Sequence, residues 1–231
     1  MEHFETIYAS RAIEYHQMIA AEDIDAQLLP AIERVTSAHG KRILDLGTGT
    51  GRLPLLIGEQ AAQMVGLDLY GDMLRQNVAQ RRRHGGRWTL IQGDMRRLPV
   101  RSAWAELVTA GWAIGHMRRW FAGDWRTQIN QVLQEMHRVA APAGALIIFE
   151  TLSTGSLTPT PPTAELGEYY DWLEHEWDFS RDTIPTDYHF ASVDEAIART
   201  EFFFGQEMAA RIREHGWACL PEWTGVWSKL L

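Results

Sequence analysis

The chain has little of what disulfide-bonded, metal-binding, nucleic-acid-binding or membrane proteins require. Its 231 residues include one cysteine, Cys219, which excludes an internal disulfide and a cysteine-ligated zinc or iron–sulfur site. Its net charge of -8 leaves little basic surface for DNA or RNA. Its longest apolar runs, such as 144–149, are too short to span a bilayer, and its first residues lack a secretory signal. We therefore expect a cytoplasmic protein that binds neither nucleic acid, membrane nor metal.

The most informative segment that is present covers residues 43–51 and reads ILDLGTGTG. An apolar strand there runs into a turn with alternating glycines: Gly47, Gly49 and Gly51. Glycine tolerates positive φ and has no Cβ, so a ligand can approach the backbone closely. A dinucleotide fingerprint, G-x-G-x-x-G, would require glycine where Arg52 stands, and Asp45 would repel a pyrophosphate. The segment therefore disfavours a nicotinamide cofactor.

The pattern Asp45-x-Gly47-x-Gly49-x-Gly51 resembles the first motif of the class I S-adenosylmethionine-dependent methyltransferases, particularly the small-molecule enzymes of types 11 and 25. The resemblance implies that this turn, including Thr48, binds S-adenosyl-L-methionine, whose product is S-adenosyl-L-homocysteine. An ordinary strand-to-helix turn with glycines for tight packing is the alternative. Motifs carry the resemblance over about residues 5–151, and only coarse architecture carries it over 152–231.

A second short strand ends in Asp68, 17 residues after Gly51. Nucleotide-binding α/β folds use a carboxylate here to accept both ribose hydroxyl hydrogens, and the resemblance gives Asp68 this role. It also implies that Leu69 lies against the adenine ring, with Met73 nearby. Helix capping is the alternative for Asp68, and core packing for the two apolar residues.

The next strand ends in IQGDM, residues 91–95. The resemblance implies that Asp94 accepts a hydrogen bond from the adenine amino group and that Met95 offers its backbone amide. A turn-forming aspartate is the alternative.

Residues 107–116, LVTAGWAIGH, run from a strand into a loop where the resemblance implies that the cofactor's methionine end meets the substrate. Gly111 and Trp112 would line that junction. An acceptor that must lose a proton needs a base, and His116 is the first candidate, with Glu150 the second. A surface or capping role is the alternative for His116. The loop lacks the Asn/Asp-Pro-Pro-aromatic sequence of amino-methylating DNA and RNA enzymes.

Near the N-terminus, Tyr8, Ala12 and Tyr15 reproduce the spacing of an entry helix seen in many small-molecule methyltransferases. Residues seven apart share a helix face, so both tyrosines would close over the cofactor. An amphipathic helix packed on the sheet edge is the alternative.

Aromatic residues are dense within 112–125 and 169–179. Such residues suit a wall against an apolar molecule or a cation, although helix packing explains many of them equally well. Arg118 and Arg119 are candidates for binding an acidic group of the acceptor.

Strand-like and helical segments alternate along the chain, which predicts a parallel sheet covered by helices. Strands are expected at 42–46, 64–68, 87–92, 106–111, 144–151, about 182–190 and 224–230. Helices are expected at 5–20, 22–38, 52–60, 71–83, 123–140, 164–176 and from 192 to about 205. We therefore expect an α/β, Rossmann-like fold with a seven-stranded, mostly parallel sheet and helices on both faces. The resemblance implies that the last strand is antiparallel.

We expect one methyltransferase domain over 1–231, with a helical cap at 1–40, a cofactor-binding core at 41–151 and a variable substrate-side region at 152–231. The stretch 151–162, rich in threonine and proline, reads as a lid or hinge. The predicted activity is in-line methyl transfer to a small-molecule acceptor whose identity stays open. Two alternatives also stay open: a nicotinamide-dependent oxidoreductase of related fold, and a cofactor-binding protein without turnover.

Overall fold

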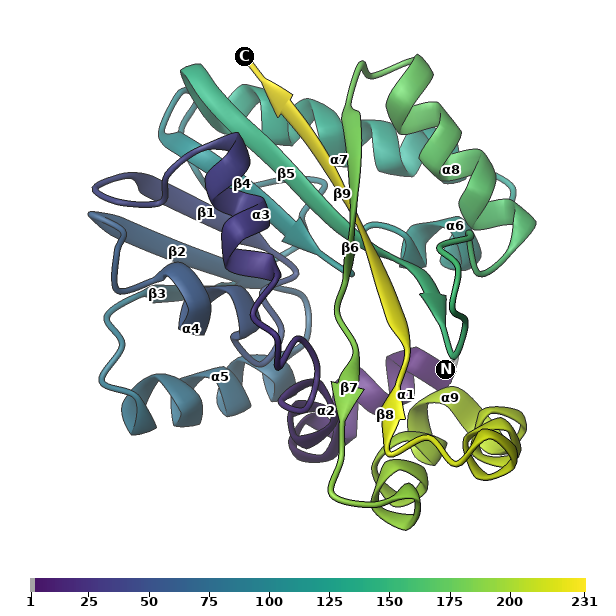
Figure 1. The fold of residues 1–231 in the computed structure, drawn as a ribbon. Helices are drawn as coiled ribbons and strands as arrows, with labels where there is room; N and C mark the ends of the chain where they lie inside the picture. Colours follow the sequence, from purple (N-terminus) through teal and green to yellow (C-terminus); the bar gives the residue numbers. More distant parts are fainter. Residues whose placement is uncertain (1–2) are drawn as a thin grey trace.

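The computed structural model describes residues 3–231, and Figure 1 shows its helices and strands. The strands are β1 (Arg42–Leu46), β2 (Gln63–Asp68), β3 (Thr89–Gln92), β4 (Ala105–Gly111), β5 (Ala140–Thr154), β6 (Ser180–Pro185), β7 (Tyr188–His189), β8 (Cys219–Leu220) and β9 (Glu222–Leu230). The helices are α1 (His3–Ser10), α2 (Ala12–Ile19), α3 (Leu28–Val35), α4 (Arg52–Ile57), α5 (Gly71–Arg83), α6 (His116–Trp120), α7 (Trp125–Val139), α8 (Ala164–His175) and α9 (Val193–His215).

One seven-stranded sheet organises the chain, in the order β3-β2-β1-β4-β5-β9-β6. Strands β1 to β5 run parallel to one another. Strand β9, the last in sequence, runs antiparallel to both β5 and β6 (Figure 1). The α/β, Rossmann-like fold with an antiparallel last strand is therefore confirmed.

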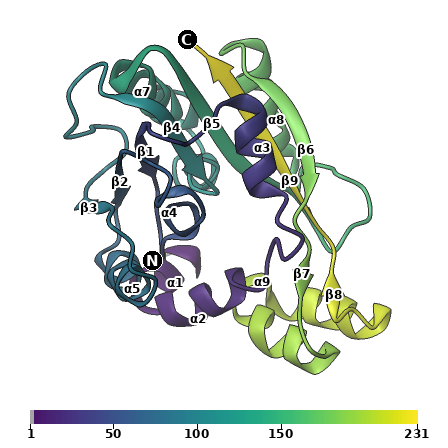
Figure 2. The ribbon, with the colours of Figure 1, turned by 60° about the vertical axis from the view of Figure 1, so that its left-hand side comes forward.

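Helices cover both faces of the sheet (Figure 2). Successive residues of a strand point to opposite faces, and the two main cores follow this alternation. On the face covered by α7 and α8, the core includes the fully buried side chains of Leu44, Val108 and Leu146. Facing α3 and α4 are those of Ile43, Leu107 and Ile147. Because the central strands are buried on both sides, they read as continuous apolar runs in the sequence.

Helices α1, α2 and α9 form a further layer at the end of the sheet where the parallel strands finish (Figures 1 and 2). Apolar contacts between Met18 of α2 and Ile212 of α9 belong to a separate small core there. Ligands of open α/β sheets bind at the carboxyl ends of the strands. The layer therefore stands over the place where a ligand is expected.

The N-terminal helices differ from the prediction. The helix expected over 5–20 is broken at Arg11, which has φ -125° and ψ 32°. The helix expected over 22–38 begins only at Leu28, because Asp23 and Ala26 adopt positive φ. The chain therefore turns twice before α3.

The C-terminal third also differs. The strand expected over 182–190 is two strands: β6 joins the main sheet and β7 pairs with β8 in a separate two-stranded sheet. Gly205 does not end α9 but kinks it, at φ 83° and ψ 177°. Strand β5 continues to Thr154, so the first residues of the expected lid are strand. The capping signature at Ser192 is confirmed, since its hydroxyl accepts a hydrogen bond from the Glu195 amide at 3.1 Å.

Smaller differences in boundary occur elsewhere. Strand β3 starts at Thr89 rather than 87, and α4 ends at Ile57 rather than 60. Residues 116–120, expected as loop, form α6. Within residues 3–231, no helix has the length and apolar composition needed to cross a membrane. The division into cap, core and substrate-side region stays a prediction.

Candidate functional site

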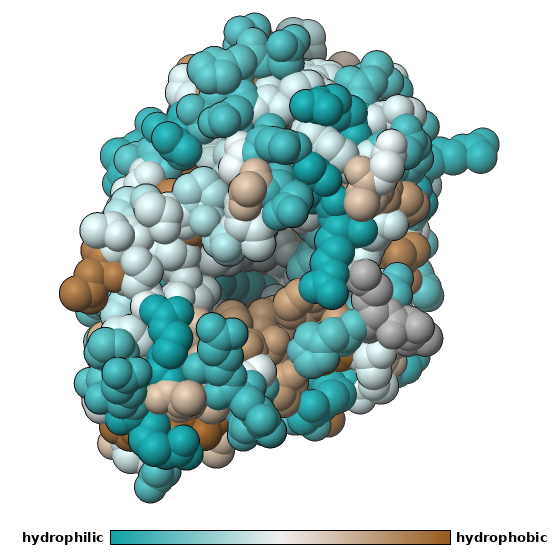
Figure 3. Space-filling view, turned by 90° about the vertical axis from the view of Figure 1, so that its right-hand side faces the viewer, coloured by the Kyte–Doolittle hydropathy of each residue, from teal (hydrophilic) through white to brown (hydrophobic). Residues whose placement is uncertain are grey.

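Two adjoining cavities lie at the carboxyl ends of the strands. The smaller, of about 260 Å³, lies against the ends of β1, β2 and β4. The larger, of about 850 Å³, lies between the N-terminal helices, α9 and the ends of β5 and β9. They share one wall, made of Tyr8, Tyr15, Trp112, His116 and Trp120. Figure 3 shows a hollow on this side of the molecule, with hydrophilic residues around it and hydrophobic surface along one side.

Most of the residues predicted to bind cofactor line the smaller cavity. They are Tyr15, Gly47, Gly49, Asp68, Leu69, Met73, Asp94, Met95, Gly111 and Trp112, and the predicted base His116 joins them. These residues come from separate strand ends and from two helices. The parallel topology brings them to one place.

The glycine turn forms a cradle that a side chain would fill. Gly47 has φ +64°, and a Cβ at this position would lie 2.4 Å from the Cβ of Ala113. Gly49 also has positive φ, and its amide donates to Asp68 Oδ2 at 2.8 Å. Positive φ and the lack of space both require glycine at position 47. The residues present thus suit a ligand that approaches the backbone.

The Asp68 carboxylate is fixed at the edge of the smaller cavity. Its Oδ1 accepts the amide of Tyr70 at 2.8 Å, complementing the bond from Gly49 to Oδ2. Burial raises its pKa, against the opposing effect of these backbone hydrogen bonds. Each carboxylate oxygen keeps a second lone pair, so ligand hydroxyls can still donate to it.

Three predicted residues lie behind the cavity wall. Asp45 is buried, and its Oδ1 accepts the hydroxyl of Thr109 at 2.6 Å. Burial raises the pKa of Asp45 to about 7. Thr48 packs beneath Gly66, and Gly51, at φ +102°, packs against Asn77. These residues shape the turn from behind.

Asp94 stands on the rim of the smaller cavity with Arg96 as its partner. The guanidinium Nε lies 3.0 Å from each carboxylate oxygen and lowers the pKa of Asp94. Arg96 also lies over the Phe121 ring, 5.0 Å from its centre. Sequence reasoning missed this role of Arg96, although an Asp and an Arg two residues apart after a strand end were a usable signal.

His116 lies at the junction of the cavities. Its Nε2 is 2.8 Å from the hydroxyl of Tyr8, and its ring stacks on Trp120 with centres 5.1 Å apart. The imidazole ring is half-buried and lines both cavities. Desolvation by the surrounding protein lowers its pKa to about 4. His116 is therefore neutral at physiological pH and already hydrogen-bonded.

Glu150 lies on the floor of the larger cavity near the end of β5. Its Oε1 accepts the amide of Gly115 at 2.7 Å. Burial raises its pKa to about 8 despite the backbone hydrogen bonds from Gly115 and Ile114. A base works best when its pKa lies close to the operating pH. Of the two candidate bases, Glu150 meets this condition and His116 does not.

Aromatic side chains and engaged cations make up much of the larger cavity's wall. Trp112 and Trp120 line it as predicted, whereas Trp125 packs in the main core. Sequence reasoning missed four lining residues from distant segments: Phe4, Tyr188, Phe203 and Phe204. Arg118 and Arg119, the candidates for binding an acidic group of the acceptor, both line the cavity. Arg118 is already paired with Glu168 at 2.6 Å.

Comparisons with known proteins agree with this architecture. Residues 43–144 match the family described as "Methyltransferase domain". The chain is 28% identical over 149 residues to the malonyl-[acyl-carrier protein] O-methyltransferase of Pseudescherichia vulneris, covering 64% of this chain and 52% of that protein. It is 32% identical over 124 residues to the ubiquinone/menaquinone biosynthesis C-methyltransferase UbiE of Syntrophotalea carbinolica, covering 53% and 48%. The chain thus spans about half the length of these two relatives.

A solved structure extends the likeness over the whole chain. The Haemonchus contortus phosphoethanolamine N-methyltransferase 2, in complex with S-adenosyl-L-methionine, matches with a TM-score of 0.61 and 14% identity, covering 99% of this chain and 60% of that one. At this identity the likeness shows a shared fold.

A glycine turn and an acidic residue at the ends of neighbouring parallel strands define a nucleotide-binding protein of Rossmann-like fold. The matched family segment begins in the first of these strands, and over this segment the chain is similar to the class I S-adenosylmethionine-dependent methyltransferases. The family match, and the S-adenosyl-L-methionine bound in the solved structure, agree with the cofactor that the resemblance implied.

Proposed function

We propose that the protein transfers a methyl group from S-adenosyl-L-methionine to a small molecule bound in the larger cavity. The shared wall of the two cavities, at Tyr8, Trp112 and His116, carries this proposal. S-adenosyl-L-methionine supplies an electrophilic methyl carbon, which bonds to a lone pair of the acceptor as its bond to sulfur breaks and S-adenosyl-L-homocysteine leaves. A cofactor held in one cavity and an acceptor held in the other would meet at this wall.

The smaller cavity would hold the cofactor through the residues predicted from the resemblance. Asp68 would accept the ribose hydroxyls, and Asp94 the adenine amino group. Leu69 and Met73 would lie along the adenine ring, and Met95 would offer it a backbone amide. The backbone of Gly47, Gly49, Gly111 and Trp112, with the Tyr15 side chain, would hold the methionine end. Asp45, Thr48 and Gly51 would act indirectly, by holding the turn in shape.

In the larger cavity, the chain would act mainly by positioning. Holding two reacting groups in line replaces a bimolecular encounter and lowers the activation barrier by up to about 7–11 kcal/mol. Helices α1, α2 and α9 cover the strand ends and would restrict the access of water. Where the acceptor must lose a proton, Glu150 would take it, a contribution of about 10²–10⁴ in rate. Tyr8 and His116 would orient the reacting atoms.

The cavity and the relatives support a first choice of acceptors to assay. A volume of about 850 Å³ lies within the range of small-molecule sites. The two curated relatives are named as O- and C-methyltransferases, one of malonyl-[acyl-carrier protein] and one of ubiquinone and menaquinone biosynthesis. Malonyl thioesters and quinone precursors, the acceptor types that these names suggest, are therefore included among the acceptors to assay.

Calorimetry with S-adenosyl-L-methionine, S-adenosyl-L-homocysteine and NADH tests the cofactor half of the proposal. We expect micromolar binding of the first two and none of NADH. Turnover is then measured as S-adenosyl-L-homocysteine formed with each acceptor. Binding of NADH alone would favour the oxidoreductase, and cofactor binding without product from any acceptor would favour a protein without turnover.

A further inference from the structure

One end of the larger cavity holds two carboxyl groups and one cation. Glu22 and Glu222 are 8% and 2% exposed, and both line the cavity. Arg52 donates through Nη1 to Glu22 Oε2 at 2.7 Å, and its guanidinium lies 4.0 Å from the centre of the Trp112 ring. Glu22 and Arg52 therefore form an ion pair in which Arg52 Nη2 has no hydrogen-bond partner among residues 3–231, and Glu222 is the additional acid.

Glu222 is only partly satisfied. Its Oε2 is buried and has no hydrogen-bond partner among residues 3–231. A buried carboxylate is costly unless it is paired, because the protein interior solvates charge poorly. Burial and the neighbouring Glu22 raise its pKa well above the usual range, against the opposing effect of hydrogen bonds from Thr154 and Thr151 and of the Arg52 charge. A positive group from a ligand would supply the missing partner.

Two other arginines that line the cavity, Arg118 and Arg211, already interact with other residues. Arg118 is paired with Glu168 at 2.6 Å. Arg211 donates to the carbonyl of Gly155. Neither is therefore available to neutralise Glu222 without breaking an existing contact.

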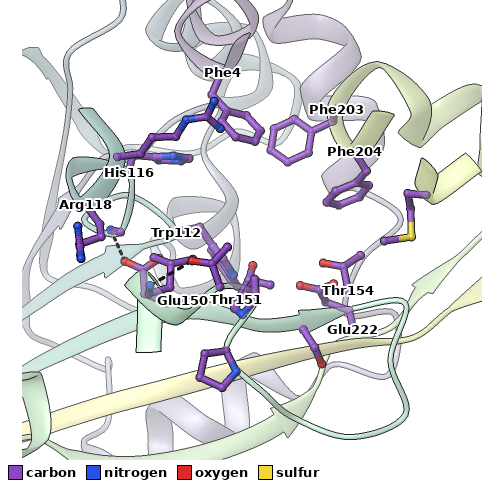
Figure 4. A pocket seen from close by; sticks show the side chains of 18 of the residues that line it. Phe4, Trp112, His116, Arg118, Glu150, Thr151, Thr154, Phe203, Phe204 and Glu222 are labelled. Atoms are coloured by element: carbon purple, nitrogen blue, oxygen red, sulfur yellow. Dashed lines mark hydrogen bonds between the residues drawn. The ribbon is translucent and has the colours of Figure 1, made fainter. Parts of the chain in front are cut away.

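The walls around this end suit a cation that also has an apolar body. Tyr188, Phe203 and Phe204 line the cavity, and ring faces attract ammonium groups. Figure 4 shows Phe203 and Phe204 across the cavity from Glu222 and Thr154. A carboxyl group and aromatic rings on opposite sides are a common arrangement for holding an organic ammonium.

This end is separated from the position where the methyl group would be transferred. Glu222 pairs with Thr154 and Glu150 pairs with Gly225 in the β5–β9 ladder. Glu150 and Thr154 are four positions apart on β5, which corresponds to roughly 13 Å of strand. A ligand held at Glu222 would therefore reach the junction with another part of the molecule.

We propose that the methyl acceptor carries a basic nitrogen, which binds as an ammonium group between Glu222 and the aromatic wall and anchors the molecule while a different atom is methylated. This inference rests on the proposed function, since it assigns the larger cavity to the acceptor. It defines the acceptor as an amine with an apolar or aromatic body.

Isosteric probes test the inference without knowledge of the natural acceptor. Protein saturated with S-adenosyl-L-homocysteine is titrated calorimetrically with 2-phenylethylamine, 3-phenylpropanoate and 2-phenylethanol. We expect the amine to bind at least tenfold more tightly than the acid and more tightly than the alcohol. The inference would be overturned if the acid bound as tightly as the amine. It would also be overturned if the amine and the alcohol bound equally, or if neither bound detectably.

Substitutions locate the effect. Glu222→Gln should weaken the amine at least tenfold and change the alcohol less than twofold, and Glu222→Asp should keep the preference for the amine. Glu165→Gln is the matched control, because Glu165 lines the same cavity but is exposed. An unchanged amine affinity in Glu222→Gln would also overturn the inference. Should that variant not fold, the wild-type comparison of the three probes decides.

The saturation step separates the two proposals. If the wild-type protein did not bind S-adenosyl-L-homocysteine, the result would count against the proposed function. Normal binding of S-adenosyl-L-homocysteine without a preference for the amine would count against the anchoring role of Glu222 alone.

Discussion

The two cavities are built in different ways. The smaller is lined by residues at and after the ends of β1, β2 and β4, all within residues 47–121 apart from the N-terminal helices. The larger is lined by side chains from α1, α2, β5, α8, α9 and β9, which span nearly the whole sequence. A ligand common to a family suits a site fixed by strand ends, whereas a variable ligand suits a site made of exchangeable side chains.

The strongest test of this difference is a single Cβ in the glycine turn. Gly47→Ala would place its Cβ 2.4 Å from that of Ala113, at a φ that alanine rarely adopts. We expect S-adenosyl-L-homocysteine affinity to fall by a factor of about 100 or more, an effect of about 3 kcal/mol. The matched control is Gly40→Ala, which has φ +71° but no atom within 4 Å of the added Cβ. Equal affinities in the two variants would refute a cradle that depends on close approach.

A smaller effect is expected from Asp68, a charged side chain fixed in the same wall. Asp68→Asn keeps the shape but removes the charge that faces the proposed ribose hydroxyls. Hydrogen bonds to charged groups contribute about 1.5–3 kcal/mol, so the dissociation constant should rise about 10- to 100-fold. Asp72→Asn is the control, since Asp72 pairs with Arg75 on the first turn of α5. A melting curve for each variant separates loss of binding from loss of fold, because Asp68 also holds the amides of Gly49 and Tyr70.

On the acceptor side, the Glu150 carboxyl should make stability depend on pH. Its folded-state pKa of about 8 lies above the ordinary value of 4.5. Between these values the folded protein keeps a proton that the unfolded chain has released, so the unfolding free energy should fall as pH rises. Glu150→Gln removes this contribution, which has a slope of at most about 1.4 kcal/mol per pH unit. Denaturant unfolding at pH 5 to 9 measures this dependence, and exposed Glu176→Gln is the control. If the unfolding free energies of wild type and Glu150→Gln changed equally with pH, the raised pKa would be contradicted.

The smallest effect on the cofactor should come from the aromatic wall. Phe204→Leu removes a ring from the larger cavity, and Phe204 is not among the residues that line the smaller one. S-adenosyl-L-homocysteine affinity should therefore stay within about twofold, while 2-phenylethylamine should bind several-fold more weakly, since a cation near a ring gains about 0.5–2 kcal/mol. A variant that weakens both ligands alike would show that the cavities are coupled rather than separate.

The same contrast explains what the sequence made predictable. Asp68 ends a strand, and Gly47 and Asp94 follow a strand within a few residues, so local pattern and the parallel topology were enough to bring them together. Phe204 and Glu222 reach the larger cavity only through the return of the chain along α9 and β9, which no local pattern encodes.

Local sequence signals gave a wrong helix end at Gly205, and they did not indicate that the Asp45 side chain is buried. Gly205 is a plausible helix stop, yet its positive φ only kinks α9, because helical geometry resumes beyond it. The acid of the first motif was expected at the ligand, but Asp45 turns inward to Thr109, since its strand is buried on both faces. Which face a strand-end side chain takes depends on the packing of its neighbours.

The direction of β9 also decides where the protein can be handled. Because β9 runs back from the cavities, Leu231 is found at the opposite end of the sheet, where its amide bonds to the carbonyl of Gly144 and the residue is 41% exposed (Figure 1). Phe4, by contrast, lines the larger cavity. A fluorophore or surface linker attached through Leu231 would leave the cavity mouth clear, whereas one attached beside Phe4 would obstruct it.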